Sequence, residues 1–197
     1  MGEQRFDNEQ LLTERLSMRR PTRADVDAIH AIHRDPRACA HNPSDMLATR
    51  RDAEDLYRRW AAHWQHHGFG YWVIRRRRGN GSGAVLGFCG LKLMRLGGRE
   101  VLNLFYRIAP SAWGDGVATE AATAVVAWAI AYVPEHPVIA RVRPDNAASA
   151  RVAARAGLRH AEQLDTYGED GIDWIYIGNW EGTARTAPST SVDSPPR

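Results

Sequence analysis

The sequence has little cysteine and no long apolar run. Its 2 cysteines, Cys39 and Cys89, are too few for a disulfide framework, and this usage is typical of a reducing compartment. No apolar stretch approaches the roughly 20 residues that a membrane-spanning helix needs. The N-terminus, MGEQRFDNEQ, lacks the apolar core of a signal peptide, and Phe6 stands where the myristoylation pattern requires Ser or Thr. We therefore expect a soluble cytoplasmic protein with no membrane partner.

An excess of charge of one sign is also missing. The formal net charge is only +3 over 197 residues, which gives mild attraction for anions and is far from a nucleic-acid-binding composition. The run Arg75 to Arg78 follows the strand pattern YWVI and leads directly into GNGSG, so these arginines are expected to be solvated at a hairpin tip. With 44% hydrophobic and 25% charged residues, the chain has a globular composition. We expect no nucleic-acid partner.

Hydrophobic periodicity predicts an α/β (α+β) domain with a mixed sheet. A capping box of Thr22 and Asp25 is expected to open the first helix, and Gly68 to end the second. Between them, the irregular loop 36–46 is expected to line a cleft. The expected strands cover residues 15–20, 71–78, 84–94, 99–108, 138–142, 160–165 and 173–180, and the later helices residues 119–133 and 145–156. Residues 1–180 are expected to form one domain, and residues 181–197, rich in Ser, Thr and Pro, a disordered tail.

The stretch APSAWGDGVATEA places glycine at the junction of a strand and a helix. Gly114, Gly116 and Ala118 occupy alternate positions, directly after Pro110 closes the strand. Glycine here indicates that something approaches the main chain closely in front of a helix N-terminus, where free N–H groups favour an anion, often a phosphate. The chain lacks the glycine patterns of a P-loop and of a dinucleotide-binding turn.

Two motifs, WGDGVATEA and later RPDNAASARVAARAGL, resemble those of the GNAT acetyltransferases, and most closely the branch that contains the ribosomal-protein N-terminal acetyltransferases. The resemblance spans roughly residues 12–180. It implies a mixed, mostly antiparallel central sheet flanked by helices, with the fourth and fifth strands splayed apart. It also implies acetyl-CoA as co-substrate, with the amides of residues 114–119 around its diphosphate. The implied cofactor-binding residues are Ile108, Trp113, Gly114, Asp115, Gly116, Val117, Ala118, Thr119, Asn146, Ser149 and Arg151.

The reaction that the resemblance implies is attack of a neutral amine on the acetyl thioester, through a tetrahedral intermediate. It needs an acceptor for the amine proton and a donor for the departing thiolate. The family's acidic tyrosine falls on Ala153, and Ser149 is the expected substitute. The family's basic glutamate falls on Asn103, three residues before Tyr106; Asn103 can hydrogen-bond an amine or a water but cannot take its proton.

Several points stay open from the sequence. Glu162, Asp165 and Tyr167 are further candidates for the base, beside a proton relay through water. Glu120, in the first turn of a helix, is expected to favour the helix dipole and hold the loop rather than catalyse. The histidines lie in helices among arginines without a matching Cys or Asp cluster, so we expect surface histidines and no metal.

We therefore expect an acetyl-CoA-dependent N-acetyltransferase. Its acceptor would be a protein N-terminus or a small amine, such as an amino acid, a polyamine or an antibiotic. A homodimer is expected by analogy with the branch. The alternative is a non-catalytic acyl-CoA-binding module.

Overall fold

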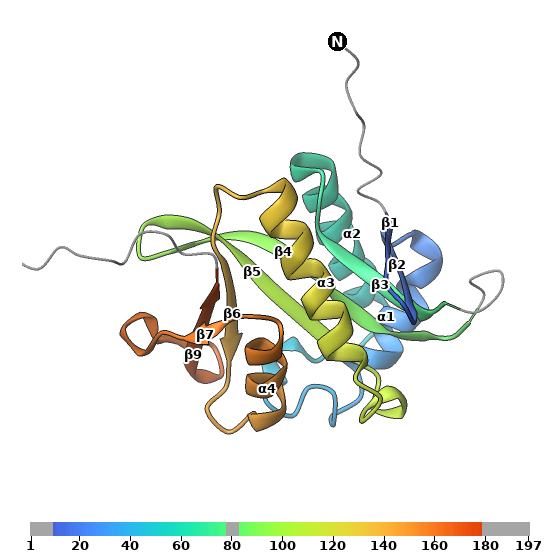
Figure 1. The fold of residues 1–197 in the computed structure, drawn as a ribbon. Coiled ribbons are helices and arrows are strands. Elements are labelled where there is room, and N and C mark those ends of the chain that lie inside the picture. Colours follow the sequence, from blue (N-terminus) through green and yellow to red (C-terminus); the bar gives the residue numbers. More distant parts are fainter. Residues whose placement is uncertain (1–9, 78–82, 179–197) are drawn as a thin grey trace, which may run out of the picture.

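The computed structural model describes residues 10–77 and 83–178, and nine strands among these residues form a mixed sheet (Figure 1). Their order across the sheet is β1-β2-β3-β4-β5-β6-β9-β7, with β8 paired to β9. Each pair is antiparallel except β5–β6, so the expected mixed, mostly antiparallel sheet is confirmed. The strands are β1 (Gln10–Leu12), β2 (Leu16–Arg19), β3 (Tyr71–Arg76), β4 (Val85–Leu96), β5 (Arg99–Ile108), β6 (Val138–Val142), β7 (Arg159–His160), β8 (Thr166–Gly168) and β9 (Gly171–Gly178).

Helices cover both faces of the sheet. Helix α3 (Val117–Tyr132) crosses one face over β4 and β5, and α1 (Val26–His33) and α2 (Arg50–His67) lie behind the opposite face (Figure 1). Helix α4 (Ala147–Arg155) follows β6. The predicted capping box of Thr22 and Asp25 is present, and Gly68 ends α2 with a φ of 72°. None of the helices described is long and apolar enough to cross a membrane.

Strand β5 separates the two layers of the core, because successive side chains point to opposite faces. Leu102, Leu104 and Ile108 belong to the cluster that contains the buried face of α3. Phe105 packs instead against the cluster formed by α1 and α2. By the same alternation, the odd-numbered residues 103 and 107 share the face of Phe105.

Strands β5 and β6 pair over only part of their length. The parallel register joins Leu102 to Val138, Asn103 to Ile139 and Leu104 to Ala140, although β5 continues to Ile108 and β6 to Val142. These two are the fourth and fifth strands of the sequence-based prediction, and their expected divergence is confirmed.

The prediction was wrong for residues 160–165. Only Arg159–His160 forms a strand there, and Glu162–Leu164 forms a 3-10 turn. The Asp165 carboxylate accepts the Ile175 amide at 2.8 Å, so a side chain replaces the main-chain partner that a continued strand would supply. The short strand β1 was not predicted, and the proposed tail, residues 181–197, lies outside the described residues.

The arginine run is also not simply solvated. Arg75 forms an ion pair with the buried Asp25 at 3.3 Å, and Arg76 pairs with Asp115. Arg77 donates to the Thr13 carbonyl at 3.0 Å. These three side chains hold the β2–β3 edge together, whereas Arg78 lies outside the described residues.

Candidate active site

The glycine-rich loop before α3 exposes bare backbone. Gly114 and Gly116 have φ angles of 84° and 73°, in the left-handed region that side chains with a Cβ avoid. Gly116 is the N-cap of α3, and no side chain caps the helix there. A Cβ at Gly114 would meet nothing within 4 Å, and one at Gly116 only the Arg15 guanidinium, at 3.3 Å. The first amides of α3 are therefore available to an anion.

Contacts behind the loop fix its position. Glu120, in the first turn of α3, accepts hydrogen bonds from the Thr13 hydroxyl at 2.5 Å and the Arg15 amide at 3.0 Å. Partial burial opposes ionisation of Glu120, but the hydrogen bonds from Thr13 and Arg15 outweigh it and lower the pKa of this carboxyl. Arg15 also donates to the Asp115 carbonyl at 2.9 Å. Glu120 thus has the loop-holding role expected from the sequence.

The loop forms one end of a cavity of about 1140 Å³ that runs past the diverging ends of β5 and β6. Residues from both faces of β5 line it. The predicted residues along its wall are Asn103, Ile108, Trp113, Gly114, Gly116, Val117, Ala118, Thr119, Asn146, Ser149 and Arg151.

Two predicted residues are not part of this wall. The carboxylate of Asp115 pairs with Arg76, so only its main chain remains a candidate for contact. Tyr167 is 80% exposed and lies outside the cavity lining. The alternative bases Glu162 and Asp165 also lie outside it, and Asp165 is engaged by His160 and the Ile175 amide.

A hydroxyl pair lies where α4 approaches β5. The Tyr106 Oη is 2.6 Å from the Ser149 Oγ and 2.9 Å from the Ser149 carbonyl oxygen. Burial raises the pKa of Tyr106 well above its ordinary value, so the phenol stays protonated and can donate. Asn146 caps α4 by accepting the Ser149 amide at 2.9 Å, which leaves the serine hydroxyl free of the capping role.

The other half of the cavity lies on the α1 and α2 side of β5. The loop 36–46 lines it, as predicted, together with His33, Tyr71 and Arg107. The prediction of surface histidines was wrong for His33, which is 2% exposed and stacks on Phe105. Burial and the nearby Arg107 lower the pKa of His33 to about 3, so this imidazole is neutral at pH 7.

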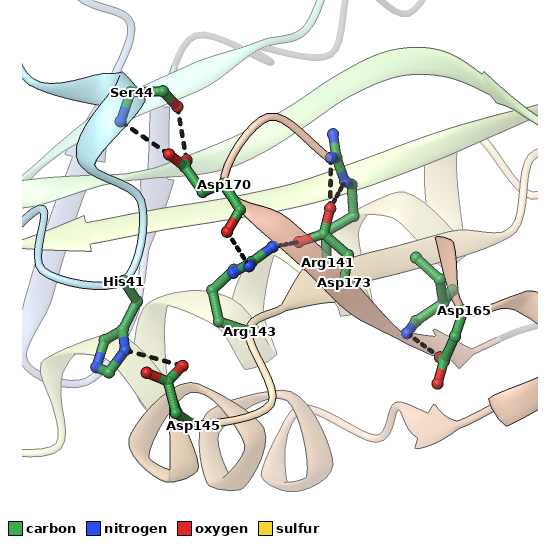
Figure 2. Close-up of polar contacts among 9 residues, drawn as sticks. His41, Ser44, Arg141, Arg143, Asp145, Asp165, Asp170 and Asp173 are labelled. Carbon is green, nitrogen blue, oxygen red and sulfur yellow. Dashed lines mark hydrogen bonds and ion pairs between the residues drawn. The ribbon is translucent and has the colours of Figure 1, made fainter. Parts of the chain in front are cut away.

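Three polar contacts hold the loop 36–46 across this half. His41 approaches Asp145, which precedes α4, at 3.3 Å. The Ser44 hydroxyl donates to Asp170, in the β8–β9 turn, at 2.6 Å (Figure 2). Asp45 accepts from Arg107 of β5 at 2.7 Å. Because each contact reaches a different element, the loop forms a wall of the cavity.

Beside this wall, Asp173 is buried and binds two guanidinium groups. Arg141 donates to its Oδ2 and Arg143 pairs with its Oδ1 at 3.3 Å (Figure 2). Within residues 10–77 and 83–178, no group of three or more His, Cys, Asp or Glu side chains could hold a metal ion.

The splayed parallel pair, the bare helix N-terminus and the cavity between them define an acyltransferase type of α/β fold. The chain matches the model of the acetyltransferase (GNAT) domain over residues 15–159, and it belongs to this family of acetyltransferases.

Comparisons with individual proteins agree. The uncharacterized protein YkkB of Bacillus subtilis is 29% identical over 98 residues, a match that spans 50% of this chain and only 55% of that protein. The acetyltransferase of Agrobacterium tumefaciens str. C58 has a TM-score of 0.72 and 25% identity over 90% of this chain and 98% of its own. RimL, a ribosomal L7/L12 α-N-protein acetyltransferase solved with coenzyme A, has a TM-score of 0.66 and 16% identity over 85% of this chain and 96% of its own.

Proposed function

We propose that this protein transfers the acetyl group of acetyl-CoA to a primary amine. The observation that supports this most is the bare N-terminus of α3, where two left-handed glycines leave main-chain amides open to a diphosphate. The exposed Arg151 and Arg155 line the same end of the cavity and add positive charge. The residues present therefore fit a CoA molecule, which would supply the activated acetyl group.

Ser149 is the proposed acid for the departing thiolate. A hydroxyl must offer its proton to the sulfur, so another donor has to occupy its lone pair. The buried Tyr106 phenol, 2.6 Å away, is suited to donate to the Ser149 Oγ. Tyr106 would then direct the serine proton into the cavity and replenish it after transfer.

Asn103 is the proposed contact for the acceptor amine. Its Oδ1 is buried without a hydrogen-bond partner and the side chain lines the cavity, so it can accept a hydrogen bond from the amine. The nearby carboxylates of the cavity are largely engaged: Asp45 by Arg107, Asp170 by Ser44 and Asp173 by two arginines. We therefore propose that an ordered water removes the amine proton.

The test is release of CoA thiol, followed with a thiol reagent, when acetyl-CoA is mixed with a panel of amines. The panel pairs small amines with peptides that have free N-termini. Release that depends on an amine and is reduced in Ser149→Ala supports the proposal. Tight acetyl-CoA binding without CoA release for any amine would favour the non-catalytic acyl-CoA-binding module instead.

A further inference from the structure

Strand β5 presents two unsatisfied polar atoms to the acceptor half of the cavity. Among the described residues, three buried side-chain atoms have no hydrogen-bond partner: His30 Nε2, Asn103 Oδ1 and Arg107 Nη1. The last two lie on one face of β5, and both residues line the cavity. An unsatisfied buried polar group costs about 1–3 kcal/mol, and more when it is charged. Such atoms gathered in one cavity indicate groups that a ligand completes.

Arg107 is the more unusual of the two. The residue is only 6% exposed, and its Nη2 donates to Asp45 at 2.7 Å, while the Asp45 side chain is 49% exposed. The Cys39 thiol also lies beside the guanidinium, but a thiol is a weak acceptor and this one donates to the His33 carbonyl. A guanidinium has a planar fork of donors that matches a carboxylate or a phosphate. Arg107 therefore has unused capacity for an anion.

The surrounding charge favours the same kind of ligand. Arg141 and Arg143 share the single carboxylate of Asp173, so this part of the wall has a surplus positive charge. Arg59 and Lys92 line the cavity as well, and neither forms an ion pair with another described residue. The carboxylate of Asp170 partly offsets this charge, but Ser44 already binds it.

We infer that the acceptor is an amine that also has an anionic group, a carboxylate or a phosphate, with Arg107 binding the anion and Asn103 the amine. This inference rests on the proposed acetyl transfer. Residues 103 and 107 are four positions apart, roughly 13 Å along a strand. Acceptors with several atoms between amine and anion therefore fit better than those in which the two groups are adjacent.

Matched acceptors test the inference. CoA release is compared for 4-aminobutyrate and butylamine, for 6-aminohexanoate and hexylamine, and for 2-aminoethyl phosphate and ethylamine. Each anionic amine should have a KM at least 10-fold below that of its neutral partner, the gain expected for a hydrogen bond to a charged group. The phosphate pair tells which anion is preferred. Equal KM values within every pair would overturn the inference and leave acetyl transfer standing.

Two variants separate an anion site from a merely structural ion pair. Arg107→Gln should raise the KM for anionic acceptors at least 10-fold and leave that for neutral amines unchanged. Asp45→Asn should lower the KM for anionic acceptors, because the guanidinium loses its resident carboxylate. If both variants impair all acceptors alike, Arg107 is structural and the inference fails. Arg58→Gln is the control, since this exposed arginine forms helix ion pairs away from the cavity.

Folding and the proposed function are controlled separately. Thermal unfolding and acetyl-CoA affinity show whether each variant folds, and the double variant Arg107→Gln/Asp45→Asn keeps the site neutral if the single change is unstable. If wild-type protein releases no CoA with any amine, the proposed transfer fails. Calorimetric binding of 6-aminohexanoate and hexylamine then still decides the inference, because equal affinities would contradict it.

Discussion

Replacing Gly116 by Asp tests the proposed diphosphate site. The new carboxylate would stand at the N-cap of α3, beside the amides proposed to hold the diphosphate. Two unit charges of like sign about 4 Å apart repel by about 1 kcal/mol in water and about 4 kcal/mol at an effective dielectric constant of 20. At 1.4 kcal/mol per factor of ten, acetyl-CoA affinity should fall between about 5-fold and about 1000-fold. Arg15, the one group near the new Cβ, is already bound to Glu120 and offers little relief.

The strain at this position has to be separated from the charge. With a φ of 73°, a residue other than glycine adds about 1–2 kcal/mol of strain, which lowers folding stability. Gly116→Ala introduces the strain without the charge. Gly98→Asp introduces both at another left-handed glycine, with a φ of 82°, in the β4–β5 turn away from the cavity.

Calorimetry with two ligands gives the decisive comparison. Acetyl-CoA contains the diphosphate and S-acetyl-pantetheine does not, so Gly116→Asp should weaken only the first, and Gly98→Asp neither. Unchanged acetyl-CoA affinity in Gly116→Asp, or an equal loss for both ligands, would refute the assignment of the loop.

Three further predictions concern the acid, the loop support and the buried histidine. Ser149→Ala should lower kcat at least 10-fold with little change in the KM for acetyl-CoA, and Tyr106→Phe should lower it less; a normal kcat in Ser149→Ala would reduce the serine to a structural role. Glu120→Gln should lower the free energy of unfolding in urea by about 1–3 kcal/mol, because hydrogen bonds to a charged carboxylate are lost; no change would contradict the loop-holding role. Because the pKa of His33 is about 3 in the folded protein against 6.5 unfolded, the unfolded state binds more protons between these values. Stability should therefore fall as the pH decreases through this window, by up to about 1.4 kcal/mol per unit, and less so in His33→Phe; parallel urea profiles for the two proteins would count against this.

The glycine loop was predictable from sequence because its requirement is local. Gly114 and Gly116 adopt the left-handed angles that only glycine takes easily, and the helix follows directly. The cap of Thr22 and Asp25 and the end of α2 were predictable for the same reason. Each of these features depends on neighbours along the chain.

The acceptor half of the site was not predictable in this way. Tyr106 meets Ser149 only because the sheet and α4 converge, and no spacing in the sequence encodes that contact. Arg107 interrupts the hydrophobic pattern of its strand, which is a usable signal, but its partner Asp45 comes from a distant loop. The 3-10 turn after β7 depends on a tertiary contact of Asp165.

The most direct test of the central claim is a crystal structure with coenzyme A. The account predicts the diphosphate oxygens within about 3 Å of the main-chain amides of residues 116–119, and the thiol beside the Ser149 hydroxyl. A diphosphate bound elsewhere, or an empty loop at saturating coenzyme A, would contradict it.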